Sequence, residues 1–179
     1  MKVISGSLKG RNIIGFNIEG TRPTMDRVKE SVFASIQDYL KGSVVLDLFA
    51  GSGNLGIECL SNYAKFVYFN DKNIESVKVI KKNLSNFNIS NAKVLNLDYV
   101  KCLNTIDTKF DLIFLDPPYK MEVISSILDI IIKKDLLTKN GLVICETESN
   151  ITYNNYDLYK FKKYGSKKVY ILRRIYEEK

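Results

Sequence analysis

The segment Asp-Pro-Pro-Tyr at residues 116–119 carries groups that could act on an amino group of a planar base. Neither proline has an N–H, so the backbone offers carbonyl oxygens beside the Asp116 carboxylate, and all of these accept hydrogen bonds. The Tyr119 ring offers a flat face on which a base could stack. An exocyclic amine is a poor nucleophile because its lone pair is delocalised into the ring. Two aimed acceptors would favour its attack on a methyl donor. The alternative is a Pro-Pro turn with a tyrosine in the core.

A glycine-rich turn supplies a candidate site for the donor. Gly51, Gly53 and Gly56 follow a short apolar run with the spacing Gly-x-Gly-x-x-Gly, which allows a sharp turn and a close approach of the backbone to a ligand. Asp71 follows the first glycine by about 20 residues, at the end of the next predicted strand, where an acid can accept hydrogen bonds from ribose hydroxyls. The alternative is a set of glycines that only closes a tight turn.

Two further acids favour S-adenosylmethionine over a dinucleotide at this turn. Asp47 lies just before the glycines, where a carboxylate would repel a pyrophosphate but would suit the ammonium of a methionine moiety. Asp98 ends the third predicted strand and could accept a hydrogen bond from an adenine amino group. Both acids have structural alternatives, because Asp47 could cap the turn and Asp98 could cap a helix around Tyr99–Leu103.

These residues need a parallel sheet to bring them together, and the pattern of the chain predicts one. Short apolar runs alternate with helical segments, which is typical of an α/β fold with helices on both faces of the sheet. The predicted strands are Ser43–Phe49, Lys65–Asn70, Lys93–Leu97, Phe110–Leu115 and Leu142–Thr147. The predicted helices between them are Asn54–Ser61, Ile74–Asn86 and Met121–Lys134. Two last strands, Leu158–Tyr164 and Lys168–Ile175, have no helix between them and predict an antiparallel hairpin that completes a seven-stranded, mostly parallel sheet.

The chain before this alternation predicts a small extension. Residues 2–14 contain two short extended candidates around glycines, which indicates a β-hairpin. Thr24 is a candidate N-cap for a helix over Met25–Tyr39, whose apolar positions follow helical spacing. We expect one domain over residues 1–179, with a hairpin and helix extension at 1–42 and a Rossmann-like core at 43–179.

Composition excludes several classes of site. The chain has no histidine, so a Ser-His-Asp triad and His-ligated metal sites are excluded, and its three cysteines form no Cys-x-x-Cys pair. We therefore expect no metal, and we find neither a signal peptide nor a membrane-spanning run. The net charge of +7 is concentrated at residues 1–42 and 151–179, while the middle is nearly neutral. Two basic ends around a neutral core indicate a polyanion partner, although a lysine-rich composition alone is the alternative.

Four segments together resemble the RsmD-type methyltransferases, which modify the N2 amine of one guanine in bacterial small-subunit (16S) ribosomal RNA. They are residues 46–58 around the glycine turn, the Thr-Arg-Pro-Thr segment at 21–24 with its continuation to Glu30, the residues 4–11, and the corner at 116–119. The resemblance covers nearly the whole chain in order. It departs from the family at Asp71, where many relatives have a glutamate, and at Cys59 and Asn62.

The resemblance implies a set of site residues. S-adenosylmethionine would be held by Asp47, Phe49, Ala50, Gly51, Gly53, Asp71 and Asp98. The catalytic residues would be Asp116, Pro117 and Tyr119. The guanine and the surrounding RNA would be contacted by Pro118, Arg11, Arg22 and Arg27.

The resemblance also implies a partner and a location. We expect a cytoplasmic monomer with a Rossmann-like, S-adenosylmethionine-dependent methyltransferase fold that acts on ribosomal RNA in an assembled small subunit. The same corner occurs in adenine-N6 DNA or RNA methyltransferases, which remain an alternative, as does a non-catalytic nucleic-acid-binding domain. Asp47 disfavours a third alternative, an NAD-dependent reductase.

Overall fold

Apolar runs between glycine-rich or charged turns fold as the strands of one mixed sheet. The computed structural model describes residues 1–16, 22–118 and 120–176. Its helices are α1 (Arg22–Ser35), the 3-10 helix η1 (Gln37–Tyr39), α2 (Asn54–Ser61), α3 (Ile74–Asn86), α4 (Tyr99–Thr105) and α5 (Ile124–Lys133). Its strands are β1 (Val44–Asp47), β2 (Phe66–Asn70), β3 (Ala92–Leu95), β4 (Phe110–Leu115), β5 (Leu137–Thr147), β6 (Tyr156–Tyr164) and β7 (Lys167–Arg174).

The sheet has seven strands in the order β3-β2-β1-β4-β5-β7-β6. Strands β1 to β5 pair in parallel because each connection between them contains a helix that carries the chain back along the sheet. Strand β7 pairs antiparallel with both β5 and β6, and a tight turn with Gly165 at φ 59° joins β6 to β7. The predicted fold class, a mostly parallel sheet closed by an antiparallel hairpin, is confirmed.

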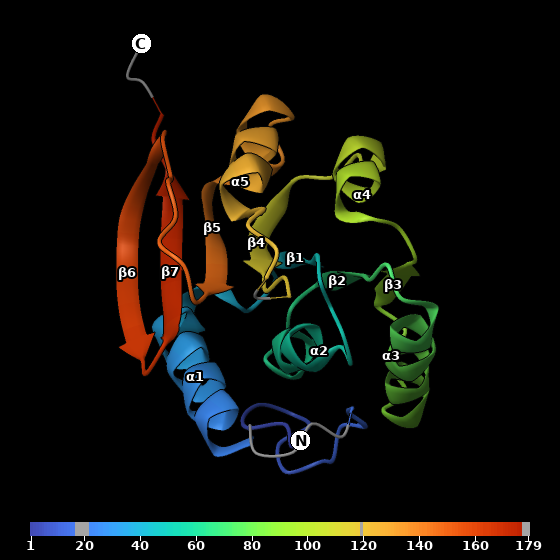
Figure 1. The fold of residues 1–179 in the computed structure, drawn as a ribbon. Helices are drawn as coiled ribbons and strands as arrows, with labels where there is room; N and C mark the ends of the chain where they lie inside the picture. Colours follow the sequence, from blue (N-terminus) through green and yellow to red (C-terminus); the bar gives the residue numbers. More distant parts are fainter. Residues whose placement is uncertain (17–21, 119, 177–179) are drawn as a thin grey trace.

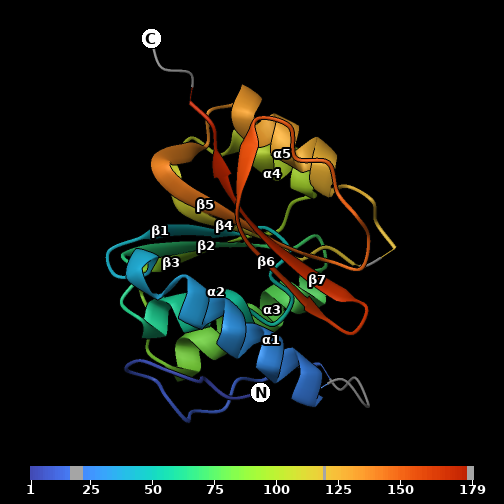
Figure 2. The ribbon, with the colours of Figure 1, turned by 90° about the vertical axis from the view of Figure 1, so that its left-hand side faces the viewer.

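Helices cover both faces of the sheet (Figures 1 and 2). Helices α1, α2 and α3 lie on one face, where Phe33 packs on Phe114 with ring centroids 5.9 Å apart. Helices α4 and α5 lie on the other face, where Ile127 and Ile131 are fully buried. The carboxyl ends of the parallel strands therefore open between two helical layers. None of the helices described is long and apolar enough to cross a membrane.

The segment at residues 1–16 packs on the outer side of α2 and α3 (Figure 2) and is less regular than the hairpin predicted for it. Its two halves meet at one antiparallel bridge between Lys2 and Asn12, with no strand on either side. Gly6 and Gly10, at φ 81° and 84°, turn the chain between these halves. The segment gains most of its hydrogen bonds from α2 and α3 instead of from itself, and this explains why a ladder does not extend.

Helix α1 begins earlier than predicted. Thr24 was expected to be its N-cap, but the helix starts at Arg22, so Thr24 lies inside the first turn and this prediction is wrong. Pro23 is compatible with that start because the first turn of a helix leaves its N–H groups without helical partners. The helix ends at Ser35, and the chain then forms the 3-10 helix η1. The predicted helix ran to Tyr39 without a break.

Candidate active site

A cavity of about 1000 Å³ opens beyond the carboxyl ends of the parallel strands. Its walls come from the loops after β1, β2, β3 and β4, from α1, and from the segment at residues 1–16. This is the position where open α/β sheets bind ligands, since several loops converge there. The volume is sufficient for a nucleoside-sized ligand together with part of a second molecule.

The loop after β1 is held in place by the end of β2. Gly51 and Gly53 have φ of 58° and 86°, a region that residues with a Cβ rarely adopt. The Gly51 N–H donates a hydrogen bond to Asp71 Oδ2 at 2.9 Å, and Asp71 Oδ1 accepts one from Asn73 N–H at 2.9 Å. Asp71, Gly51, Phe49 and Ala50 all line the cavity. The pair predicted from its spacing, Gly51 and Asp71, thus meets directly.

Asp47 and Gly53 lie behind this loop and do not line the cavity that the described residues form. Asp47 is 1% exposed, and its Oδ2 accepts a hydrogen bond from Gly56 N–H at 3.1 Å. A Cβ on Gly56 would lie 2.2 Å from Cε1 of Phe69. The third glycine therefore permits close packing of α2 on β2, as in other folds with this spacing. Asp47 caps the start of α2, which was its structural alternative.

The buried position of Asp47 predicts a pH-dependent stability. Burial raises its pKa to about 7, with the charges of Asp71 and Glu146 acting in the same direction and the Gly56 N–H against them. The folded protein thus holds a proton at Asp47 more tightly than the unfolded chain, so the free energy of unfolding falls as the pH rises from about 4 to about 7. The substitution Asp47→Asn removes the titrating carboxyl group and therefore this pH-dependent fall in the free energy of unfolding.

We therefore expect the melting temperature of Asp47→Asn, relative to the wild type, to rise between about pH 5 and about pH 8. Thermal unfolding of both proteins at the two pH values checks this. Asp47 also raises the pKa of Asp116, so Asp47→Asn removes this contribution as well, and its effect on stability has the same sign. A difference that stays constant across the pH range would contradict the assignment to Asp47.

Asp98, the third acid predicted to bind the donor, shares its cavity wall with two aromatic rings that could contact a planar ligand. Asp98 lines the cavity, and its Oδ1 accepts a hydrogen bond from Lys101 N–H at 3.0 Å, so it also caps α4. The rings of Phe49 and Tyr99, on the same wall, lie 5.7 Å apart between centroids. The sequence did not single out Asn70, whose buried side chain donates to the carbonyls of Leu48 and Leu97 and ties two loops of the wall together.

The Asp-Pro-Pro-Tyr corner begins directly after β4. Asp116, Pro117 and Pro118 line the cavity, and the Pro118 carbonyl accepts a hydrogen bond from Met121 N–H at 2.8 Å. Burial, together with the charge of Glu146 and a hydrogen bond to it, raises the pKa of Asp116 well above its ordinary value. Tyr119 lies outside the described residues. The corner therefore brings a carboxyl group of raised proton affinity to the cavity.

Two charged residues beside Asp116 were missed by the sequence analysis. Glu146, on β5, and Lys167, on β7, both line the cavity, with Lys167 Nζ 3.5 Å from Glu146 Oε1. Both also line an adjoining hollow of about 170 Å³ with Asp116. Glu146 could have been found, because it stands at the carboxyl end of a predicted parallel strand. Lys167 could not, because the register of the antiparallel hairpin is not readable from the sequence.

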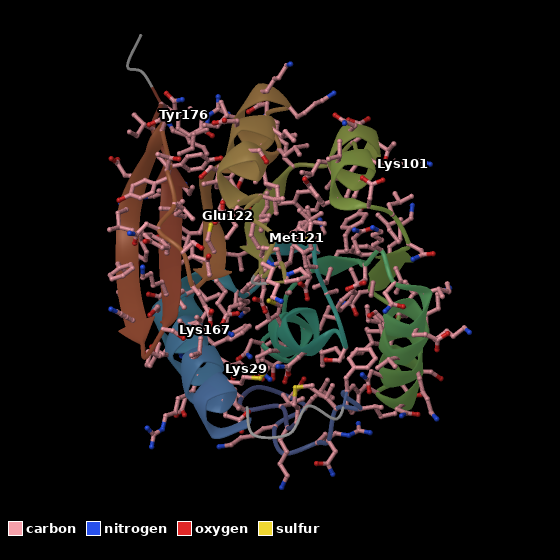
Figure 3. The ribbon with its side chains drawn as sticks, viewed as in Figure 1. Lys29, Lys101, Met121, Glu122, Lys167 and Tyr176 are labelled. Atoms are coloured by element: carbon pink, nitrogen blue, oxygen red, sulfur yellow. The ribbon has the colours of Figure 1, made fainter. Side chains whose placement is uncertain are left out.

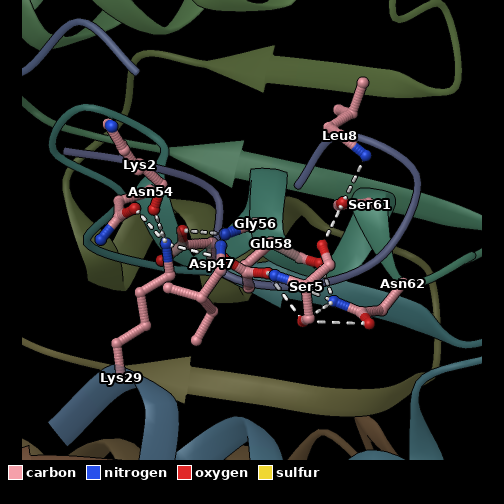
Figure 4. Close-up of polar contacts among 11 residues, drawn as sticks. Lys2, Ser5, Leu8, Lys29, Asp47, Asn54, Gly56, Glu58, Ser61 and Asn62 are labelled. Atoms are coloured by element: carbon pink, nitrogen blue, oxygen red, sulfur yellow. Dashed lines mark hydrogen bonds and ion pairs between the residues drawn. The ribbon is translucent and has the colours of Figure 1, made fainter. Parts of the chain in front are cut away.

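Lys29 lines the cavity on the side of α1 and forms a buried ion pair with Glu58 (Figure 4). Lys29 Nζ lies 2.8 Å from Glu58 Oε1 and donates to Asn54 Oδ1 at 2.7 Å, and Lys29 and Glu58 are 4% and 0% exposed. Glu58 also accepts hydrogen bonds from the backbone N–H groups of Ile4 and Ser5. The pair therefore joins α1, α2 and the segment at residues 1–16.

The three arginines predicted to contact substrate are dispersed. The Arg11 guanidinium donates to the carbonyl of Asn86 at 3.1 Å and lies 4.7 Å above the Phe87 ring, outside the cavity wall. Arg27 is exposed on α1. Arg22 begins α1, and its side chain lies outside the description. Within the described parts of the chain, no group of His, Cys, Asp and Glu could hold a metal ion.

The sheet order, the antiparallel β7 and the cavity at the strand ends define the class of Rossmann-like methyltransferases. Solved structures agree with this class. A structure from Escherichia coli described as a methyltransferase, yhhF, superimposes with a TM-score of 0.87 at 26% identity, and covers 97% of each chain.

The family follows from the sequence comparisons. The family model described as "Conserved hypothetical protein 95" matches residues 1–173. "Ribosomal RNA small subunit methyltransferase D" from Buchnera aphidicola is 37% identical over 89% of this chain and 86% of its own length. The protein of the same name from Haemophilus influenzae is 38% identical over 92% and 89%. The chain belongs to this ribosomal RNA methyltransferase D family, and the resemblance stated from the motifs is confirmed.

Proposed function

We propose that this protein transfers a methyl group from S-adenosylmethionine to the N2 amine of a guanine in small-subunit ribosomal RNA, as a cytoplasmic monomer. One observation carries the proposal. Asp116 and Pro117 line the same cavity as Phe49, Gly51 and Asp71. A base amine presented at the corner would therefore face a donor bound along the glycine loop. The names of the family relatives supply the substrate class.

The acidic wall of the cavity suits S-adenosylmethionine. Asp71 keeps acceptor capacity for ribose hydroxyls, because each carboxylate oxygen has a second lone pair beyond its bond to the backbone. Phe49 and Tyr99 would enclose an adenine ring beside Asp98, which would accept from its amino group. The ionised form of Asp47, whose pKa is about 7, would favour the ammonium end through the loop by its charge. When bound, S-adenosylmethionine supplies an electrophilic methyl group on its sulfonium.

The corner would prepare the amine for attack. Asp116 and the Pro117 carbonyl would accept its two hydrogens, fix its orientation and stabilise the positive charge that develops on nitrogen. Tyr119, by its place in the motif, would stack on the base. The new N–C bond leaves the nitrogen with one proton in excess. Asp116 in its ionised form lies at the corner to accept this proton, and its raised pKa favours proton uptake.

The substrate is tested with labelled donor. Purified protein and S-adenosylmethionine carrying a labelled methyl group would be incubated with assembled small subunits that lack this modification, with naked 16S RNA, and with duplex DNA. We expect label in the RNA, and mass spectrometry of the digested RNA should place it on guanine N2. Label in duplex DNA but not in RNA, or on adenine N6, would overturn the proposal.

The hairpin β6–β7 is the candidate surface for the RNA backbone. Lys160 and Lys163 are exposed on β6, close to the turn that lies at the carboxyl end of β5. Reversing both charges, by Lys160→Glu with Lys163→Glu, should weaken RNA binding about 10-fold or more at low salt and less at high salt, because fewer counterions are released. Filter binding across a salt series measures this.

A matched control comes from α5. Lys133 and Lys134 are exposed at its end, on the other face and at the amino ends of the parallel strands. Lys133→Glu with Lys134→Glu makes the same change in net charge and should affect RNA binding far less. Equal losses in both double variants would show that only the total charge matters.

A further inference from the structure

Three charged side chains from three adjacent strands converge at one corner of the cavity. In the parallel pair β4–β5, Leu115 lies opposite Cys145, so the residues that follow them, Asp116 and Glu146, are neighbours. In the antiparallel pair β5–β7, Glu146 lies opposite Val169, and Lys167 stands two positions before Val169 on the same face. The order across the sheet is therefore carboxyl, carboxyl, ammonium.

All three groups are available to a ligand in the cavity. Glu146 and Lys167 have side chains 14% and 29% exposed and both contact the cavity that Asp116 lines. Figure 3 shows Lys167 at the end of β7 nearest α1, far from Tyr176 at its other end. Burial lowers the pKa of Lys167, but Glu146 and Asp116 more than offset this and raise it, so Lys167 stays charged. The site thus presents two acceptors and then one donor.

The order of these two acceptors and one donor complements the Watson–Crick edge of guanine. The Watson–Crick edge of guanine presents the N2 amine, the N1–H and the O6 carbonyl in sequence, which are donor, donor and acceptor. We propose that Glu146 accepts from guanine N1–H and Lys167 donates to O6, while Asp116 holds the N2 amine. The inference rests on the proposed function and makes Glu146 and Lys167 the residues that determine the base.

The same arrangement rejects adenine. Its N1 is an acceptor, so a lone pair would face the Glu146 carboxylate, and the edge has no O6 to accept from Lys167. A site that hydrogen-bonds specific polar groups rejects analogues that lack them strongly, because its own polar groups are left unpaired. A merely structural ion pair between Glu146 and Lys167 would not discriminate in this way.

The test uses small subunits reconstituted with ligated RNA that carries guanine or 2-aminopurine at the modified position. 2-Aminopurine keeps the N2 amine but has an acceptor at N1 and no O6. Wild-type protein should methylate guanine with a kcat/KM at least about 100-fold above that for 2-aminopurine. Comparable rates on the two bases would overturn the inference without any variant. Absence of methylation on guanine itself would instead overturn the proposed function.

Variants then assign the residues. Glu146→Gln can donate to the N1 of 2-aminopurine, so its preference for guanine should fall about 10-fold or more. Lys167→Met should slow guanine methylation and leave the rate on 2-aminopurine nearly unchanged. The controls are Lys168→Met, whose side chain bonds to Asn150, and the exposed Glu122→Gln. Guanine preference unchanged in both site variants, with cofactor affinity and melting temperature retained, would also overturn the inference.

Discussion

Replacing Asp116 with asparagine should slow methyl transfer by about 100- to 1000-fold, the loss typical when one preorganised electrostatic partner of a transition state is removed. Asparagine keeps the shape but carries no charge, so it stabilises the developing ammonium less and cannot take its proton. Asp116→Ala, which removes both oxygens, should abolish transfer. Single-turnover rates on small subunits measure both effects.

Cofactor binding distinguishes a lost catalytic group from a damaged site. The affinity for S-adenosylmethionine, measured by calorimetry, should stay within a few fold in Asp116→Asn, because the glycine loop and Asp71 are untouched. Since burial disfavours the charged form of Asp116, this variant should be at least as stable as the wild type. Asp107→Asn, exposed before β4, is the matched control. Unchanged turnover in Asp116→Asn and Asp116→Ala would remove Asp116 from the mechanism.

Replacing Lys29 with methionine should lower the free energy of unfolding by about 3–5 kcal/mol. The change leaves the Glu58 carboxylate buried without its cation, although the N–H groups of Ile4 and Ser5 still donate to it. Burial lowers the pKa of Lys29, and the charge of Glu58 opposes this effect. Urea unfolding without cofactor gives the value.

Two comparisons isolate the buried pair. Lys78→Met breaks an exposed pair with Glu75, both side chains being 66% exposed, and should cost less than about 1 kcal/mol. Adding Glu58→Gln to Lys29→Met should recover part of the loss, because no buried charge then lacks a partner. Similar losses for Lys29→Met and Lys78→Met would mean that burial of the pair does not control its contribution.

The sequence predicted the order of elements well because a parallel sheet buries both faces of its strands. Such strands are continuous apolar runs that end in polar turns, and the bounds of β4 (Phe110–Leu115) and α3 (Ile74–Asn86) were predicted without error. The meeting of Gly51 with Asp71 also followed from spacing, since successive parallel strands end at the same edge. Local pattern and topology together were sufficient for these features.

The rest depends on tertiary contacts that a linear pattern does not contain. Lys29 and Glu58 each sit on an amphipathic helix, where a charged residue normally faces solvent, and only the packing of α1 against α2 buries them. Lys167 reaches Asp116 through the register of an antiparallel hairpin. Residues 2–14 form a single bridge instead of the predicted hairpin ladder, because the N–H groups of Ile4, Leu8 and Ile14 find acceptors on α2 and α3.

The segment at residues 1–16 forms part of the cavity wall, so binding of S-adenosylmethionine should stabilise this segment in its docked position. Met1, Ile13, Gly15 and Phe16 line the cavity, and the Lys29–Glu58 pair anchors the same segment. A ligand that binds only the docked form stabilises docking by about 2.7 kcal/mol at 100 times its Kd. Protein saturated with S-adenosylmethionine should therefore resist proteolysis within residues 1–16, whereas protein without S-adenosylmethionine should be cleaved there first.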